Sequence, residues 1–370
     1  MDVRAIAFYL PQYHPIQEND EWWGKGFTEW RNVTRARPLF PGHHQPQLPG
    51  ELGFYDLRCE DTRIAQAELA REHGIFGFCY YHYWFSGQML LARPFNEVLA
   101  SGRPDFPFCL CWANENWTRA WDGSDRQILM EQTYDESSIQ AHITWLCRAF
   151  RDPRYIRVRG RPLILIYRTD ILPNVAGLLR TWRAQAQAEG FPELYIAAVL
   201  SNFPQLGEQE LIALGFDATV EFQPRRDDVP HLSARERRLL RLKERYNRLR
   251  ARTTLTFLPE ARLYSRFDYG ELAENAMARA ASVGHVRFPC VSPGWDNTAR
   301  RREPVILQND DPVVYERWLR FTAERARSRD PEERIVFINA WNEWAEGCHL
   351  EPDLRSGRQF LEATRRALVG

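Results

Sequence analysis

The chain has 370 residues, of which 44% are hydrophobic and 13% aromatic, and its formal net charge is zero. This length suits one large barrel with insertions, and the hydrophobic fraction can fill its core. The zero net charge argues against a protein drawn to nucleic acid by bulk charge. No run of about 20 apolar residues is present to form an integral membrane segment.

Eight short apolar runs predict buried strands. In chain order they are Val3–Leu10, Gly77–Tyr83, Phe106–Trp112, Leu163–Tyr167, Leu194–Leu200, Ala218–Phe222, Val286–Val291 and Ile335–Ala340. Most are continuously apolar rather than strictly alternating, which is typical of parallel strands covered by helices.

Helical stretches are predicted after each of these strands, at 60–73, 92–101, 136–151, 173–189, 206–214, 270–283, 311–328 and 356–369. Acidic residues open the first of them, and Gly74, Gly190 and Gly215 follow the ends of three. Eight strand–helix units predict an α/β fold, a single (β/α)8 TIM barrel over residues 1–370. A doubly wound sheet is the alternative, but the first turn lacks its usual glycine-rich pattern.

Two segments do not fit the repeat. Residues 15–57 form a long first loop, and residues 223–268 form an insertion after strand six. The insertion contains the arginine-rich stretch Arg235–Arg252, in which Leu239, Leu242, Tyr246 and Leu249 fall on one helical face. We expect a solvated helix there, with RNA binding or membrane binding as alternatives.

The seven cysteines are odd in number, lie mostly in apolar runs and include no C-x-x-C pair, so we expect reduced core cysteines and no zinc ribbon. The chain starts Met-Asp-Val-Arg and enters a strand-like run without a signal-peptide pattern. The expected location is the cytoplasm. We expect no metal and no cofactor, and the sequence does not predict the oligomeric state.

Polar and aromatic side chains gather at the C-terminal ends of the predicted strands, where barrel enzymes place their active sites. The candidates for sugar contact are Tyr9, Gln12, His14, Tyr80, His82, Trp84, Trp112, Asn114, Glu115, Asn116, Trp117, Glu221, Trp295, Asp296, Trp341 and Asn342. Aromatic rings edged with polar groups suit the apolar faces and hydroxyl rims of sugars. The competing interpretation is that these rings belong to an ordinary core.

The segment after strand eight reads Phe-Ile-Asn-Ala-Trp-Asn-Glu-Trp-Ala-Glu-Gly and contains two carboxylates, Glu343 and Glu346. Cleavage of a glycosidic bond commonly uses such a pair. Burial beside Trp341 and Trp344 would raise the pKa of the acid and keep it protonated near neutrality. The alternative is two solvated glutamates at the start of a helix.

Four segments together resemble the WbsX family of bacterial polysaccharide-locus proteins: Phe8–His14 with Asn19–Val33, Gly77–Phe85, Phe106–Asp122 and Phe337–Pro352. The resemblance extends over nearly the whole chain. The family is in turn similar to glycoside hydrolase family 99, whose catalytic glutamates lie in an E-W-x-E-G motif matched here by Glu343 and Glu346.

The similarity to family 99 implies a (β/α)8 barrel that cleaves α-mannosides with retention. It implies that Glu343 removes the proton of the sugar's own 2-hydroxyl, which attacks the anomeric carbon to form a 1,2-anhydro intermediate. Glu346 is then general acid and afterwards base. Ala345 departs from the histidine that these hydrolases often carry, which leaves the exact substrate open.

Three functional hypotheses follow. The first is a retaining glycoside hydrolase or transglycosylase acting on an oligosaccharide or polysaccharide. The second is a glycosyltransferase of O-antigen or capsule biosynthesis, although no D-x-D metal site and no Rossmann half support a nucleotide-sugar site. The third is a non-catalytic barrel that binds glycans.

Overall fold

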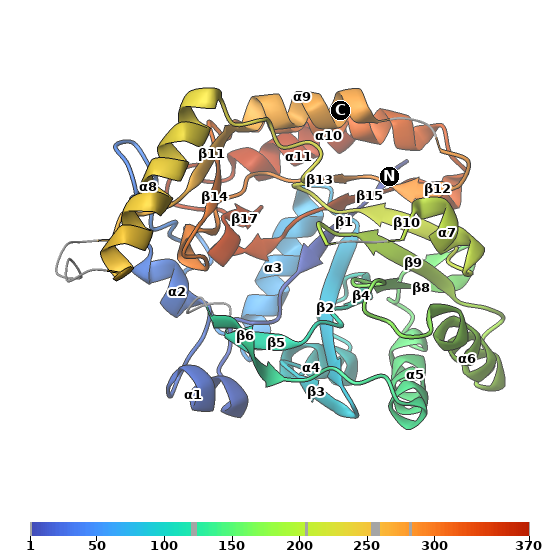
Figure 1. Ribbon diagram of the computed structural model, residues 1–370. Coiled ribbons are helices and arrows are strands. Elements are labelled where there is room, and N and C mark those ends of the chain that lie inside the picture. Colours follow the sequence, from blue (N-terminus) through green and yellow to red (C-terminus); the bar gives the residue numbers. More distant parts are fainter. Residues whose placement is uncertain (1, 120–123, 204–205, 253–259, 281–282, 370) are drawn as a thin grey trace.

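The computed structural model describes residues 2–119, 124–203, 206–252, 260–280 and 283–369 (Figure 1). Its centre is a barrel of parallel strands. They are β1 (Arg4–Tyr9), β2 (Gly77–Phe85), β4 (Phe108–Trp112), β8 (Arg161–Ile166), β9 (Tyr195–Leu200), β10 (Ala218–Glu221), β12 (Val286–Phe288), β13 (Cys290–Val291) and β15 (Ile335–Ile338). Each coincides with a predicted apolar run.

The ring closes through an interrupted seventh strand. β12 pairs with β10 and β13 pairs with β15, while Pro289 separates the two short strands. The carbonyl of Pro289 accepts a hydrogen bond from the Phe337 amide at 2.8 Å, so the pairing continues across the break. β15 in turn pairs with β1 in parallel. Counting β12 and β13 as one strand gives eight, which confirms the predicted (β/α)8 barrel.

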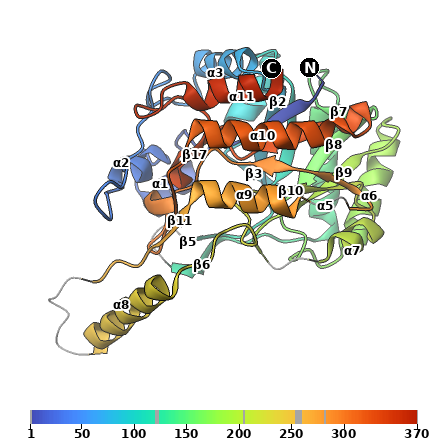
Figure 2. The same cartoon turned by 90° about the horizontal axis from the view of Figure 1, so that it is seen from above.

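In the described part of the chain, eight helices cover the outside of the barrel (Figures 1 and 2). They are α3 (Glu60–Glu72), α4 (Arg93–Ser101), α5 (Glu136–Phe150), α6 (Val175–Ala188), α7 (Glu208–Ala213), α9 (Tyr269–Arg279), α10 (Pro312–Arg327) and α11 (Gln359–Val369). Side-chain caps fix several starts: Asp135, Asn174 and Asp311 accept backbone hydrogen bonds at the N-termini of α5, α6 and α10. These helices match the predicted stretches, except that residues 281–282 lie outside the described residues.

Additional elements decorate the loops. The long first loop holds α1 (Gln17–Trp23) and α2 (Trp30–Arg35), and the insertion holds α8 (Ala234–Arg252). The remaining strands are β3 (Gln88–Leu90), β5 (Trp117–Arg119), β6 (Ser124–Met130), β7 (Arg157–Val158), β11 (Ser265–Asp268), β14 (Val305–Gln308), β16 (Asn342–Glu343) and β17 (Cys348–His349), with short 3-10 turns η3 (Asn297–Ala299), η4 (Pro331–Glu333) and η5 (Trp344–Glu346). β11 and β14 pair in parallel, so the insertion returns to the barrel.

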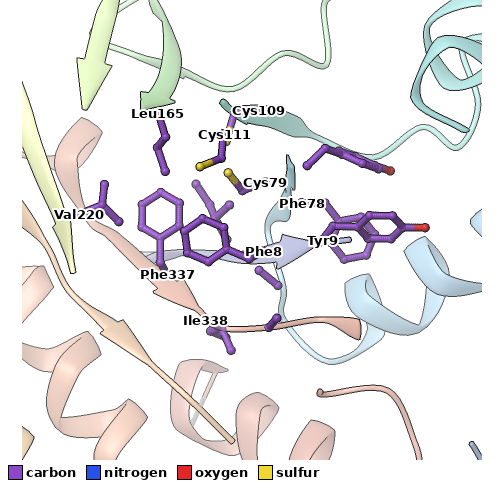
Figure 3. Packing of buried hydrophobic residues seen from close by; sticks show 14 of the residues in the cluster. Phe8, Tyr9, Phe78, Cys79, Cys109, Cys111, Leu165, Val220, Phe337 and Ile338 are labelled. Atoms are coloured by element: carbon purple, nitrogen blue, oxygen red, sulfur yellow. The ribbon is translucent and has the colours of Figure 1, made fainter. Parts of the chain in front are cut away.

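The barrel interior is packed with side chains that alternate with outward-facing ones along each strand. The Phe8 ring lies 5.3 Å from that of Phe337 and 5.7 Å from that of Tyr81, which places three strands around one point. Figure 3 shows Phe8 and Phe337 together with Cys79, Cys111, Leu165 and Val220 in this core. The next residue, Tyr9, points to the other side and bonds Gln66 of α3 at 2.7 Å.

All seven cysteines are free, and six are buried as expected. Cys59 is the exception, because it lies exposed just before α3. Within the described residues, no helix combines the length and the apolar character that crossing a bilayer requires.

Candidate functional site

A cleft of about 880 Å³ opens where the barrel strands end. Its walls come from several segments that are far apart in the sequence. The lining side chains include Gln12, Trp22, Trp23, Tyr81, Tyr83, Glu115, Asn116, Trp117, Gln132, Tyr134, Tyr167, Arg168, Phe222, Trp295, Asn297, Arg300, Arg301, Asn339, Glu343 and Glu346. Aromatic rings alternate with hydrogen-bonding groups around this space, a lining typical of a site for a polar ligand with apolar faces.

The two glutamates of the E-W-x-E-G motif meet at one guanidinium in this cleft. Arg300 Nη2 lies 2.9 Å from Glu343 Oε1, and Arg300 Nη1 lies 3.2 Å from Glu346 Oε1. A third carboxyl, that of Glu29 from the first loop, lies 3.4 Å from Arg300 Nη2. Three carboxyl groups therefore share one buried cation.

The electrostatics of this cluster favour bound protons. Burial raises the pKa of Glu343 well above its ordinary range; Arg300 opposes that shift, and the charges of Glu346 and Glu29 add to it. Burial also raises the pKa of Glu29, again against the pull of Arg300. One guanidinium cannot neutralise three carboxylates in a poorly solvated site. The three carboxyl groups can therefore hold a proton near neutral pH, as acid–base chemistry needs.

Local hydrogen bonds fix the glutamate segment. The side chain of Asn342 accepts from the Leu10 amide at 2.8 Å and donates to the Leu10 carbonyl at 3.1 Å, which ties the segment after β15 to the end of β1. The hydroxyl of Tyr13 accepts from the Trp344 amide at 3.1 Å. The Trp344 indole N–H donates to Glu351 at 2.7 Å.

The glycine of the motif is required by the turn that follows the second glutamate. Gly347 has a φ of 56°, the left-handed conformation that glycine adopts most readily. A Cβ at this position would lie 2.7 Å from the Gln47 side chain and 3.0 Å from the Asp296 backbone nitrogen. The turn therefore packs closely against two neighbouring loops, and this packing holds Glu346 in place.

Seven of the sequence-predicted site residues line the cleft: Gln12, Glu115, Asn116, Trp117, Trp295, Glu343 and Glu346. Gln12 donates to the Tyr83 hydroxyl at 2.8 Å. Glu115 pairs with Arg168 at 2.5 Å. Burial raises the pKa of Glu115, and the Arg168 pair opposes that shift.

Six predicted residues lie instead between the strands and the surrounding helices: Tyr9, Tyr80, His82, Trp84, Trp112 and Trp341. His82 bonds His142 of α5 at 2.9 Å, and Trp84 stacks on the same imidazole. Burial lowers the pKa of His82 to about 3, as expected for a neutral packing residue. The first five of these side chains have the opposite alternation from the one that faces the barrel axis, whereas Trp341 lies beyond the end of β15.

Three further predicted residues support the loops around the cleft. The side chain of Asn114 donates to the Arg168 carbonyl at 2.7 Å, Asp296 accepts from His43 and Gln45 at 2.7 Å each, and Asn342 acts as described above. None of the three is among the residues that line the cleft in the described part of the chain.

The last two predicted residues lie elsewhere. His14 is buried beside a separate depression between the first loop and α4, and Glu221 forms ion pairs with Arg279 and Arg287 at 3.2 and 3.8 Å.

Several cleft residues were not predicted from the sequence. Tyr81 lies between the predicted residues Tyr80 and His82 and points to the other side of β2, and Arg300 lies in the loop after η3. The side of β2 that faces inward could have been inferred from Cys79, because the crowded barrel interior requires a small side chain. Tyr81 lies two residues further on the same side of the strand. Arg300 carries no local signal, because only the fold brings it to Glu343.

Fold and site together define a (β/α)8 barrel protein with an aromatic-lined cleft at the ends of its strands, and comparison with known proteins gives the family. A family model described as "Glycosyltransferase WbsX" matches residues 5–364, so the chain belongs to the WbsX glycosyltransferase family. This confirms the resemblance found in the sequence.

Two curated relatives, both called "Uncharacterized protein WxcX", come from two strains of Xanthomonas campestris pv. campestris, B100 and ATCC 33913. Each is 43% identical over 371 residues, covering 100% of this chain and 50% of the relative. The chain thus spans about half the length of the curated relatives it matches.

Solved structures with a similar fold include a GH99 endo-alpha-mannosidase from Bacteroides thetaiotaomicron. It is 13% identical, with a TM-score of 0.58, and the match covers 100% of this chain and 97% of that one. A "Glycoside hydrolase-like protein" matches with the same TM-score at 15% identity, over 99% of this chain and 94% of the other. At these identities the likeness shows the shared barrel fold.

Proposed function

We propose that this chain cleaves or transfers glycosidic bonds in a bacterial surface polysaccharide, with retention of the anomeric configuration. The observation that carries this proposal is the pair Glu343 and Glu346, both held by Arg300 in a cleft walled by aromatic rings. A pair of carboxyl groups beside a cleft lined with aromatic rings is typical of enzymes that act on glycosidic bonds.

The environments of the two carboxyls support different roles. The Glu343 side chain is 7% exposed and contacts Arg300, and burial raises its pKa well above the ordinary glutamate range although Arg300 opposes that shift, so it binds a proton more strongly than an exposed carboxylate does. A carboxylate held in this way can act as a base toward a sugar hydroxyl. The Glu346 side chain is 16% exposed, so it is better placed to exchange protons with a leaving group and then with water.

In the first step the 2-hydroxyl oxygen of the sugar bonds to the anomeric carbon while the bond from that carbon to the leaving oxygen breaks. The hydroxyl proton passes to Glu343, and Glu346 gives its proton to the leaving oxygen. In the second step water attacks the anomeric carbon and opens the three-membered ring. Glu346 takes the proton of water, and Glu343 returns its proton to the 2-oxygen. An acceptor hydroxyl in place of water gives transfer instead of hydrolysis.

The cleft supports an extended glycan as the substrate. Its volume of about 880 Å³ is larger than one sugar ring needs. Tyr81, Trp117 and Trp295 offer ring faces along its length, while Gln12 and Asn116 offer amide groups to hydroxyls. The substrate named for the solved neighbours, an α-mannoside, is the first candidate.

The second candidate function is glycosyl transfer from an activated donor, favoured by the description of the family as a glycosyltransferase. The same cleft would then hold donor and acceptor together. Release of free nucleotide that depends on an acceptor distinguishes this candidate from the first.

Product analysis by mass spectrometry tests the proposal. Wild type, Glu346→Gln and the matched control Glu324→Gln, which changes an exposed glutamate of α10, are incubated with α-mannoside oligomers, the host polysaccharide and nucleotide sugars. Shorter or rearranged glycans from wild type and control, but not from Glu346→Gln, are expected. Extended glycans with free nucleotide would replace the proposal by the second candidate, and glycan binding without turnover by wild type would contradict both.

A further inference from the structure

The helix α8 stands away from the barrel and has a composition unlike the rest of the chain. Figure 2 shows it projecting from the barrel beyond the loops, and both views place it on the side where α2 and β11 lie. Its 19 residues include eight arginines, one lysine and two glutamates, although the whole chain has no net charge. The positive charge is therefore concentrated on one projecting element.

One face of α8 rests on the segment that leads back to the barrel. Asn247 donates to the Ala261 carbonyl and accepts from the Ala261 amide, both at 2.8 Å. Lys243 donates to the Arg262 carbonyl at 3.1 Å and lies over the Tyr264 ring. Positions 243, 247 and 250 lie on one side of a helix, so this side is the attached one.

On the surface of α8 that is not attached to this segment, arginines recur at helical spacing. Arg238, Arg241, Arg245 and Arg248 recur every three or four residues, so they form one row along the helix. All four are exposed, and within the described residues their side chains form no ion pair. Elsewhere, exposed arginines find acidic partners, as Arg358 does with Glu51 at 2.6 Å.

An apolar row runs beside the arginines, because each of the four is followed by an apolar or aromatic residue. Leu239 and Leu242 are 52% and 55% exposed. Further along the row, Tyr246 and Leu249 are 36% and 56% exposed. Leucines next to a row of arginines on an exposed helix are typical of a helix that lies in the interface of an anionic membrane.

We propose that α8 docks this chain on an anionic phospholipid bilayer, with its arginines at the lipid phosphates and its leucines in the headgroup region. The complementarity of charge supports the lipid as the partner. The leucines distinguish a bilayer from RNA, since an RNA site uses cations and stacking rings and gains nothing from exposed leucines. Because the insertion follows the C-terminal end of β10, docking would bring the cleft side of the barrel toward the membrane. The inference does not depend on the proposed chemistry.

Vesicle flotation tests this inference with the whole chain. The probes are vesicles of equal parts phosphatidylglycerol and phosphatidylethanolamine, with pure phosphatidylcholine vesicles for comparison. The test variant combines Arg238→Gln, Arg241→Gln and Arg245→Gln. The matched control combines Arg148→Gln, Arg180→Gln and Arg365→Gln, which removes three exposed charges from α5, α6 and α11.

Wild type and control are expected to bind the anionic vesicles and to leave the neutral ones unbound. The test variant should bind on the order of a hundredfold more weakly, since each basic residue near such a surface contributes roughly a factor of five. Leu239→Gln combined with Leu242→Gln should also weaken binding, with the net charge unchanged. Equal binding by test and control variants would overturn the inference, as would RNA binding that depends on the arginines but not on the leucines. Circular dichroism confirms that each variant is folded, and cleavage of a soluble glycan, which these changes should leave intact, reports separately on the proposed function.

Discussion

Replacement of Arg300 by methionine should make the stability of the protein strongly dependent on pH. The change removes the cation that, within the described residues, contacts Glu29, Glu343 and Glu346 together, and it leaves a side chain of similar volume. Removing one partner from a buried ion cluster costs about 3–5 kcal/mol, because the remaining charges stay desolvated and unpaired. We expect a loss of this size in the free energy of unfolding at pH 7.

The pH dependence follows from proton uptake. Without Arg300, the pKa values of Glu343 and Glu29 rise further above the ordinary glutamate value, because burial then acts unopposed. The folded state holds protons that the unfolded state has released, so stability falls as the pH rises from the unfolded pKa to the raised folded one. The slope is about 1.4 kcal/mol per pH unit for each carboxyl involved. Much of the loss should therefore disappear near pH 4.

Urea denaturation of wild type and Arg300→Met between pH 4 and pH 8 measures this effect. Arg300→Lys keeps a cation and should fall between the two, and Glu343→Gln added to Arg300→Met should restore part of the stability at pH 7. Parallel curves for wild type and Arg300→Met across the whole range would refute the reasoning, since they would mean that Arg300 does not compensate buried carboxylates.

Three further predictions concern single positions. Gly347→Ala should reduce turnover and lower stability by about 1–3 kcal/mol, since it forces a left-handed φ and a close contact beside Glu346; normal kcat in this variant would contradict the account. Tyr81→Leu should weaken glycan binding roughly tenfold by calorimetry, whereas Tyr80→Leu, on the opposite side of the same strand, should lower only the thermal midpoint. Burial raises the pKa of Glu351 to about 7, so this group lowers the stability of the fold as the pH rises from about 4.5 to 7. Glu351→Gln should remove roughly 3 kcal/mol of that pH dependence, measured by denaturation across this pH range. An unchanged pH profile would show that Glu351 is ionised in the folded protein.

The barrel could be predicted from the sequence because each strand is a distinct apolar run with helical punctuation on both sides. The seventh strand is typical: Val286–Val291 was predicted as one strand, and the structure divides it at Pro289 without breaking the ring. Because the apolar runs are continuous rather than alternating, the sequence does not reveal which side of each strand faces inward. On β2 every residue from Tyr80 to Phe85 is aromatic or histidine, so Tyr80 and Tyr81 are indistinguishable by composition.

Within the candidate site, the glutamate pair could be found because both residues lie in one short motif. Gln12 and Trp117 were identified by their position just beyond a strand. Arg300 and Glu29 were missed because their role depends on contacts over a sequence separation of 271 residues, which no local pattern reports. Asp296 was predicted from its position at the end of strand seven, yet its carboxylate accepts hydrogen bonds from His43 and Gln45.

The stereochemistry of the first product tests the central claim most directly. Proton NMR of the anomeric signal during the first minutes of turnover, on the glycan identified by product analysis, distinguishes the two outcomes before mutarotation obscures them. The roles assigned to Glu343 and Glu346 predict a first product with the anomeric configuration of the substrate, and no signal from Glu346→Gln. A first product of inverted configuration would contradict the two-step mechanism at this pair.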